Sequence, residues 1–184
     1  MGKSTSTVSR ILFGLTSEEE LAKAMESVIS KGIRDGAFPG AVAVASSRGR
    51  EAWAAEGLAQ AIPESEKREM TRETRFDVAS LTKVVVTTTL LMKSVEKGLL
   101  DLNDPVDDYL SFDKRVRVIN LANHSSGLPG WLPLYSTGAK TPAEAVKLIS
   151  QIEISEPGKE ELYSDLGFIV LGHILEKIYG MQLD

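Results

Sequence analysis

One long and mostly apolar stretch reads Phe76-Asp-Val-Ala-Ser80-Leu-Thr-Lys83-Val-Val-Val-Thr-Thr-Thr-Leu-Leu-Met-Lys-Ser-Val-Glu-Lys-Gly98. It predicts an extended lead-in and then a helix that begins near Ser80 and ends at Gly98, because glycine commonly follows a helix C-terminus. The β-branched run Val84–Thr89 favours a strand instead. We predict a helix because the stretch is long and lysines fit its last turns. A helix that is apolar nearly all round belongs at the centre of a domain.

Ser80 and Lys83 are three residues apart, so on a helix they share one face. A lysine among apolar side chains can have a lowered pKa and take the proton of a serine nucleophile. The alternative is that Ser80 is an ordinary N-cap and Lys83 is solvated. The same spacing occurs in Ser94–Lys97 and Ser111–Lys114. Only Ser80 opens a long apolar helix, so we predict the reactive pair there.

The composition is that of an ordinary globular protein. The 184 residues carry a formal net charge of -5, which gives no basic surface for nucleic acid. There is no cysteine, which excludes disulfides and thiolate chemistry, and the two histidines lie far apart in the sequence, so we predict no metal site. We also predict no cofactor, no transmembrane segment and no signal peptide. The compartment stays open, either cytoplasmic or exported with a leader removed.

The N-terminal part predicts a helix followed by a β-hairpin. Thr16 or Ser17 is expected to cap a helix whose apolar stripe consists of Leu21, Met25, Val28 and Ile29. The apolar runs 41–45 and 51–55 predict the two strands, and residues 60–75 predict an exposed connection. Gly2-Lys3-Ser4-Thr5 is similar to the end of a phosphate-binding loop, but it lacks the preceding strand, so we favour a disordered terminus.

The second half predicts loops and helices. His124 lies in a loop rich in Gly, Pro and Ser, where it is either a general base or, as we favour, a side chain that satisfies loop backbone. Thr141 is expected to cap a helix that extends through Ile149 and Ile152. A last helix is predicted over 168–179, with a buried stripe at Phe168, Leu171, Ile174, Leu175 and Ile178. Tyr163 and Asp165 fall on the loop that opens it, where polar side chains can reach a site.

Three stretches occur in the order and at about the spacing of one family: Ser80-Leu-Thr-Lys83, the segment Leu121-Ala-Asn-His-Ser-Ser-Gly-Leu-Pro129, and Pro157-Gly158 leading to Tyr163-Ser164-Asp165. The chain resembles the serine β-lactamase and penicillin-binding-protein superfamily. It looks closest to the branch with class C β-lactamases, D-alanyl-D-alanine carboxypeptidases, D-aminopeptidases and esterases. The resemblance implies an α+β fold, with an antiparallel sheet flanked by helices and an all-helical part.

The resemblance also implies a role for each site residue. Ser80 is the expected acylated nucleophile, and its backbone N–H is expected to form half of an oxyanion hole. Lys83 is expected to activate the serine. Tyr163 is expected to move the proton between the serine and the leaving group. The implied substrate is a small ester or amide.

Asp165 departs from the family pattern, which has Asn at this position. We expect Asp165 to bind substrate, but an ionised carboxylate accepts hydrogen bonds and lacks the donor of an amide. It also favours a charged Lys83. We therefore expect less β-lactamase activity and more esterase or other peptidase-like activity.

The family's third motif, Lys or His followed by a small residue and Gly, has no match after Tyr163. We therefore expect residues 1–184 to be one incomplete domain that lacks its C-terminal strands. Residues 16–58 would be the N-terminal helix and hairpin, and 76–184 the helical part. A second chain or a missing portion would complete the sheet. The alternative function is a non-catalytic ligand-binding module, or an inactive truncated relative, on the same fold.

Overall fold

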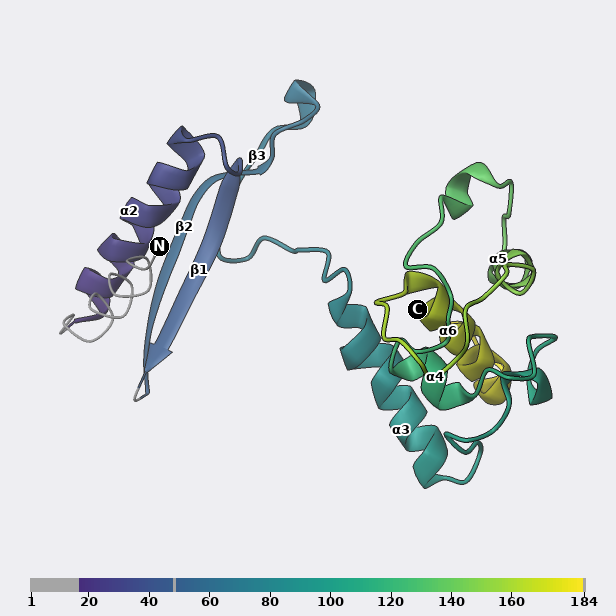
Figure 1. Ribbon diagram of the computed structural model, residues 1–184. Coiled ribbons are helices and arrows are strands. Elements are labelled where there is room, and N and C mark those ends of the chain that lie inside the picture. Colours follow the sequence, from purple (N-terminus) through teal and green to yellow (C-terminus); the bar gives the residue numbers. More distant parts are fainter. Residues whose placement is uncertain (1–16, 48, 184) are drawn as a thin grey trace. The chain divides into compact units, whose positions relative to one another are not determined.

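The computed structural model describes residues 17–47 and 49–183, so the Gly2–Thr5 stretch and Thr16 lie outside the described residues. The chain forms two compact units, Met1–Asp77 and Val78–Asp184 (Figure 1). No helix in the described ranges is long and apolar enough to cross a membrane.

The first unit begins with helix α2 (Glu18–Arg34), which packs against the hairpin that follows it. Ser17 is the N-cap. Its Oγ accepts from the Glu20 amide at 3.1 Å, and the Glu20 carboxylate accepts from the Ser17 amide at 3.2 Å. The predicted helix and cap are confirmed. The predicted stripe is right for Ile29, which is buried, and wrong for Val28, which is 67% exposed.

The hairpin consists of β1 (Gly40–Ser47) and β2 (Arg50–Gln60), paired antiparallel in one continuous register. The sequence predicted an exposed connection after it, and most of residues 60–75 are exposed. The connection also contains elements that were not predicted, a short turn (Glu64–Glu66) and a third strand, β3 (Arg68–Glu69), on the free edge of β2. The Met70 amide donates to the Gly57 carbonyl at 2.9 Å, and Met70 is buried. The free edge of β2 is thus partly paired by backbone hydrogen bonds from residues 68–70 of the connection.

The second unit opens with the predicted helix, and the β-branched run changes its geometry. Lys83–Thr88 forms a wide π-helical turn, and α3 (Thr89–Glu96) continues it as a regular helix. Two threonine hydroxyls donate to carbonyls five residues back, Thr88 to Lys83 at 2.8 Å and Thr89 to Val84 at 3.2 Å. The wider turn changes the hydrogen-bond spacing of an α-helix, and the two hydroxyls provide donors to the Lys83 and Val84 carbonyls. The β-branched run therefore forms a local π-helical turn within the helix instead of a strand. Such turns are often found near functional sites.

The central helix of this unit is α6 (Asp165–Tyr179) and not the helix at 83–96. Val84, Val85 and Met92 are all more than half exposed, so the sequence-based placement of that helix was wrong. It buries only one face, whereas α6 is buried on most sides. Gly167 and Gly172, both buried, let neighbouring segments approach α6 closely.

The remaining elements surround α6. Helices α4 (Val118–Ala122) and α5 (Pro142–Ile149) pack on it, and short turns lie at Val106–Asp108 and Leu134–Ser136. Thr141 caps α5 as predicted, accepting from the Glu144 amide at 3.2 Å. The fully buried core of this unit includes Val106, Val116, Val118, Leu121, Leu128, Ile149, Leu166, Val170, Leu171, Ile174 and Leu175.

Candidate active site

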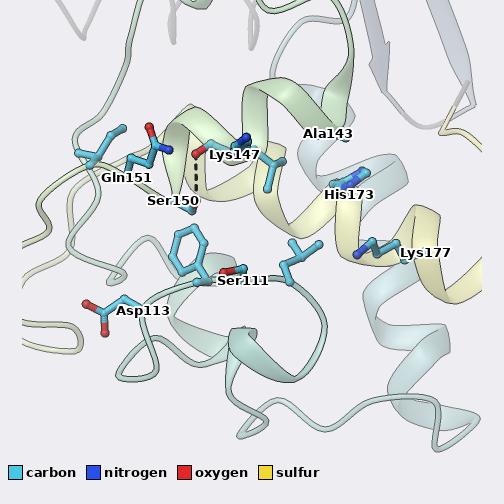
Figure 2. Close-up of a pocket in the computed structure, with 12 residues that line it drawn as sticks. Ser111, Asp113, Ala143, Lys147, Ser150, Gln151, His173 and Lys177 are labelled. Atoms are coloured by element: carbon cyan, nitrogen blue, oxygen red, sulfur yellow. Dashed lines mark hydrogen bonds between the residues drawn. The ribbon is translucent and has the colours of Figure 1, made fainter.

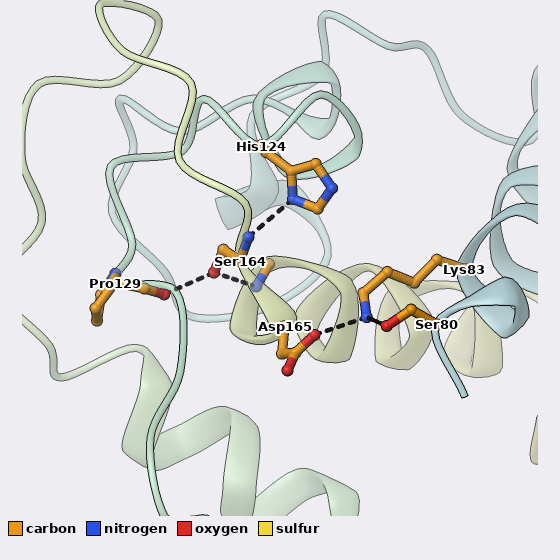
Figure 3. A network of polar contacts seen from close by, with 7 residues as sticks. Ser80, Lys83, His124, Pro129, Ser164 and Asp165 are labelled. Atoms are coloured by element: carbon orange, nitrogen blue, oxygen red, sulfur yellow. Dashed lines mark hydrogen bonds and ion pairs between the residues drawn. The ribbon is translucent and has the colours of Figure 1, made fainter. Parts of the chain in front are cut away.

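Ser80 and Lys83 meet at the start of the helix, as the sequence predicted. The Lys83 Nζ donates to Ser80 Oγ at 3.1 Å (Figure 3). Ala79, directly before the serine, has a φ of 44°, a conformation that few residues with a Cβ adopt. Backbone strain of this kind is found disproportionately at active sites. The strained residue is therefore Ala79, and Ser80 follows it directly.

Asp165 completes a short polar chain with this pair, although it lies 82 residues further along the sequence. The Lys83 Nζ lies 2.7 Å from Asp165 Oδ1, and the lysine side chain is only 16% exposed. Burial lowers the pKa of Lys83, but interactions with Asp165 and Tyr163 outweigh it, so the pKa is raised above that of ordinary lysine. The apolar neighbours in the sequence had suggested a lowered pKa instead.

The raised pKa of Lys83 determines how its charged form contributes to stability as pH changes. Lys83 gains its partners in the fold, so its contribution to stability is fully present below the unfolded pKa of lysine. It is lost as pH rises through the raised folded value. The raised pKa favours the ammonium form of Lys83, in which Nζ donates to Ser80.

Tyr163 lies beside the pair and is about half exposed. The Lys83 Nζ is 5.1 Å from the centre of its ring. Interactions of the hydroxyl with Ser80, and then with Lys83, lower the pKa of Tyr163 below that of ordinary tyrosine. A phenolate next to an ammonium is a reasonable base for a serine hydroxyl.

His124 faces Tyr163 from the loop 123–130. Its Nδ1 accepts from the Ser164 amide at 3.0 Å, which supports the backbone-satisfying role that we favoured over a general base. The carbonyl oxygens of the same loop also accept hydrogen bonds from amides of residues 155–165, the segment that leads into α6. The bonds run from Ser155 to Gly127, Gly158 to Ser125, Leu162 to His124 and Asp165 to Gly130, at 2.8 to 3.1 Å.

Ser164 is a site residue that the sequence analysis missed. It is buried and caps α6, accepting from the Gly167 amide at 3.2 Å, while its hydroxyl donates to the Pro129 carbonyl at 2.7 Å. A serine directly before an apolar helical stripe is an N-cap signal that could have identified it. Ser164 thus fixes the first turn of α6, which carries Asp165.

We expect Gly127→Ala to destabilise the second unit far more than Gly138→Ala. Both glycines have positive φ, 78° and 84°, so each substitution costs about 1–2 kcal/mol in backbone strain. A Cβ at Gly127 would also lie 2.3 Å from the Ser155 carbonyl oxygen, whereas nothing lies within 4 Å at Gly138. Denaturant unfolding of both variants measures the difference. Equal losses of unfolding free energy would contradict the close packing of the loop against Ser155.

A pocket of about 410 Å³ opens over the pair, lined by Ala79, Ser80, Thr82, Lys83, Thr87, Asp165, Phe168 and Ile169. A larger cavity of about 770 Å³ lies between α5, α6 and residues 110–113, with Lys147, His173 and Lys177 on its wall (Figure 2). It contains none of Ser80, Lys83, Tyr163 and Asp165. We assign the chemistry to the smaller pocket because a nucleophile needs its base and its charge partners within contact distance.

The other two Ser-x-x-Lys pairs have different surroundings. Ser94 is fully buried, donates to the Leu90 carbonyl at 2.8 Å and lies 3.2 Å from the Tyr179 hydroxyl, so it serves helix packing. Ser111 lines the larger cavity. Within 17–47 and 49–183, no three or more His, Asp or Glu side chains gather in a way that could hold a metal ion.

Comparison with known proteins gives consistent results. An N-acetylmuramyl-L-alanine amidase of Bacillus subtilis is 34% identical over 87% of this chain and 41% of its own length. The octameric penicillin-binding protein homologue from Pyrococcus abyssi is 26% identical, with a TM-score of 0.71 over 87% of this chain and 40% of that one. A class C beta-lactamase from Rhodobacter sphaeroides is 28% identical, with a TM-score of 0.68 over 87% and 45%.

These similarities confirm the predicted α+β fold of the β-lactamase and penicillin-binding-protein type. The chain spans about two fifths of the length of the amidase. The Beta-lactamase family model matches residues 25–184, which include every candidate site residue. The chain therefore belongs to the beta-lactamase family, whose members named above include hydrolases.

Proposed function

We propose that this chain carries the acylation site of a serine hydrolase that acts on a small ester or amide. The observation that carries the proposal is the continuous contact Ser80–Lys83–Asp165 with Tyr163 beside it. Ser80 Oγ attacks the substrate carbonyl while the Tyr163 phenolate takes the hydroxyl proton. Tyr163 then returns that proton to the leaving alcohol or amine, which departs and leaves an ester on Ser80. Water then attacks this ester while the Tyr163 phenolate takes its proton, and Tyr163 returns that proton to Ser80 Oγ as the acid product leaves.

Lys83 acts as a fixed cation in this scheme. Its ammonium donates to Ser80 and stabilises both the Tyr163 phenolate and the negative charge that develops at the serine oxygen. Asp165 holds the ammonium in place and keeps it charged. The backbone N–H of Ser80 is the proposed donor to the carbonyl oxygen in the tetrahedral intermediate.

The proposed substrate class follows from Asp165. Its carboxylate is 42% exposed and lines the pocket, so it also meets the substrate. It accepts hydrogen bonds but cannot donate one to a substrate carbonyl. We therefore favour esters and peptide-like amides with an N–H group over β-lactams. The amidase relative supports an amide substrate by its name.

A second candidate is a ligand-binding module that does not turn over its ligand. The ion pair at 2.7 Å motivates it, because with Lys83 held as an ammonium turnover would depend on Tyr163 as the one base. Under this alternative, Tyr163 would stay a neutral phenol and the pocket would bind a carbonyl compound reversibly.

Covalent labelling separates the two. The chain is exposed to p-nitrophenyl acetate, a fluorophosphonate and a penicillin, and then examined by intact-mass measurement and peptide mapping. The hydrolase predicts a single adduct on Ser80, with Ser94 and Ser111 as internal controls that stay unmodified. Adducts that appear with the first two reagents and not with penicillin support the proposed substrate class. An unmodified Ser80 with all three reagents would contradict the hydrolase and favour the binding module.

A further inference from the structure

His124 holds the backbone on both sides of Tyr163. Its carbonyl oxygen accepts from the Leu162 amide at 2.9 Å, and its Nδ1 accepts from the Ser164 amide at 3.0 Å. These two amides directly flank Tyr163 in the sequence. One residue thus fixes the position from which the tyrosine side chain extends toward Ser80 (Figure 3 shows the His124 and Ser164 contact).

The His124 ring also contacts the tyrosine side chain. The two ring centres are 4.5 Å apart with the planes tilted by 34°, and the Phe168 ring lies 5.0 Å from His124 on the pocket side. Aromatic pairs at such distances attract each other and restrict one another's rotation. The imidazole therefore limits both the backbone and the ring of Tyr163.

The backbone of His124 adopts a rare conformation. Its φ is 61°, and only one other non-glycine residue in the described ranges, Ala79 beside the nucleophile, has a positive φ. Such a conformation persists where surrounding contacts enforce it, and it is found most often at active sites and ligand clamps. At His124 the contacts that enforce it are the hydrogen bonds to the Tyr163 segment.

We propose that His124 is the positioning residue for Tyr163 and that it works only as the neutral imidazole with its proton on Nε2. The inference rests on the proposed function, because Tyr163 is the proton carrier there. An Nδ1 that accepts from an amide carries no hydrogen, so the single ring proton lies on Nε2. Protonation of Nδ1 would set two N–H donors against each other and release the Ser164 amide.

Burial and the Lys83 ammonium favour the neutral form of His124. Burial is the main cause that lowers the pKa of His124, and the Lys83 ammonium lowers it further. The carboxylates of Asp165 and Glu161 oppose this, and Tyr163 faces the ring directly. Because the folded pKa lies below the unfolded one, the contact is fully present above pH 6.5. It is lost as pH falls through the lowered value.

Two variants test the role of the Nδ1 acceptor of His124 separately from the role of its aromatic ring. His124→Asn keeps an oxygen acceptor near the Nδ1 position, tolerates positive φ and cannot be protonated in this range. His124→Phe keeps an aromatic ring and removes the acceptor. Each variant is measured twice, by the rate of Ser80 acylation against pH and by NMR titration of the four tyrosine Cζ signals, with Tyr163 assigned from Tyr163→Phe.

We expect His124→Phe to slow acylation about tenfold or more at neutral pH, because a displaced proton carrier loses its alignment. Its Tyr163 pKa should rise toward that of ordinary tyrosine. His124→Asn should stay within about threefold of the native rate. It should keep the fall in rate caused by loss of the Tyr163 phenolate but lack the additional decline that we expect for the native chain below about pH 6.5. A native Tyr163 pKa in His124→Phe, or an unchanged acid decline in His124→Asn, would overturn the proposal.

The native chain provides a test that needs neither folding of a variant nor turnover. Long-range ¹⁵N spectra of its two histidines, assigned with His173→Gln, report the protonated nitrogen. The proposal requires an Nε2–H form of His124 that persists at pH 6.5, and an Nδ1–H form would refute it. The tyrosine titration remains readable if Ser80 never acylates. Failure of the hydrolase and failure of the positioning role are therefore distinguishable.

Discussion

Lys83→Met is expected to lower the rate of Ser80 acylation about a thousandfold, since it removes a preorganised charge at the point where negative charge develops. Methionine fills a similar volume but leaves the Ser80 hydroxyl without the donor at 3.1 Å. It also removes the cation that helps lower the pKa of Tyr163. Stopped-flow or single-turnover acylation with p-nitrophenyl acetate measures the change.

Lys97→Met is the matched control for this variant. Lys97 belongs to the second Ser-x-x-Lys pair, and its Nζ lies over the Tyr179 ring at 5.6 Å, away from the pocket residues. We expect it to acylate at nearly the native rate. A Lys83→Met variant that acylates as fast as Lys97→Met, with the fold intact by circular dichroism, would rule out a role for the ammonium.

Tyr163→Phe is expected to lower acylation by a factor on the order of 10³, which is typical for loss of a general base. The ring and its contact with His124 remain, and only the hydroxyl beside Ser80 is lost. Tyr135→Phe is the control, because that tyrosine is 84% exposed and its ring centre lies 6.4 Å from that of Trp131.

The pH dependence distinguishes a phenolate from a neutral phenol. The pKa of Tyr163 is lowered, so the phenolate fraction and the acylation rate should rise with pH along a limb centred below pH 10.0, the ordinary value. Tyr163→Phe should lose this limb. A flat profile in the native chain would mean that Ser80 loses its proton to another group.

Local signals in the sequence predicted most helices and the contact between Ser80 and Lys83. The capping box at Ser17, Thr141 before Pro142 and the stripe of α6 each depend on neighbours within one or two turns. The pairing of Ser80 with Lys83 is local in the same sense. These elements were predictable because the interactions that form them lie within a few residues of one another.

Long-range contacts were not predictable in the same way. The contact between Lys83 and Asp165 joins residues 82 apart. The apolar neighbours of Lys83 suggested a lowered pKa, and only the family resemblance, through Asp165, indicated a charged lysine with the raised pKa that the structure favours. The third strand formed because the edge of β2 was available, and no periodic pattern marks Arg68–Glu69. The left-handed backbone of His124 likewise depends on amides about 40 residues away.

The π-turn at Lys83–Thr88 makes the effect of losing one residue depend on where along the helix the loss falls. A wide turn accommodates one residue more than a regular helix would place there. Loss of one residue between 84 and 88 would let the segment rewind as a regular α-helix and leave Ser80 and Lys83 on nearly the same side, because the wide turn already absorbs that residue. Loss of one residue from the regular helix Thr89–Glu96 would instead turn everything before it by about 100° about the helix axis. The second deletion would leave helix content nearly unchanged and still separate Ser80 and Lys83 from Asp165.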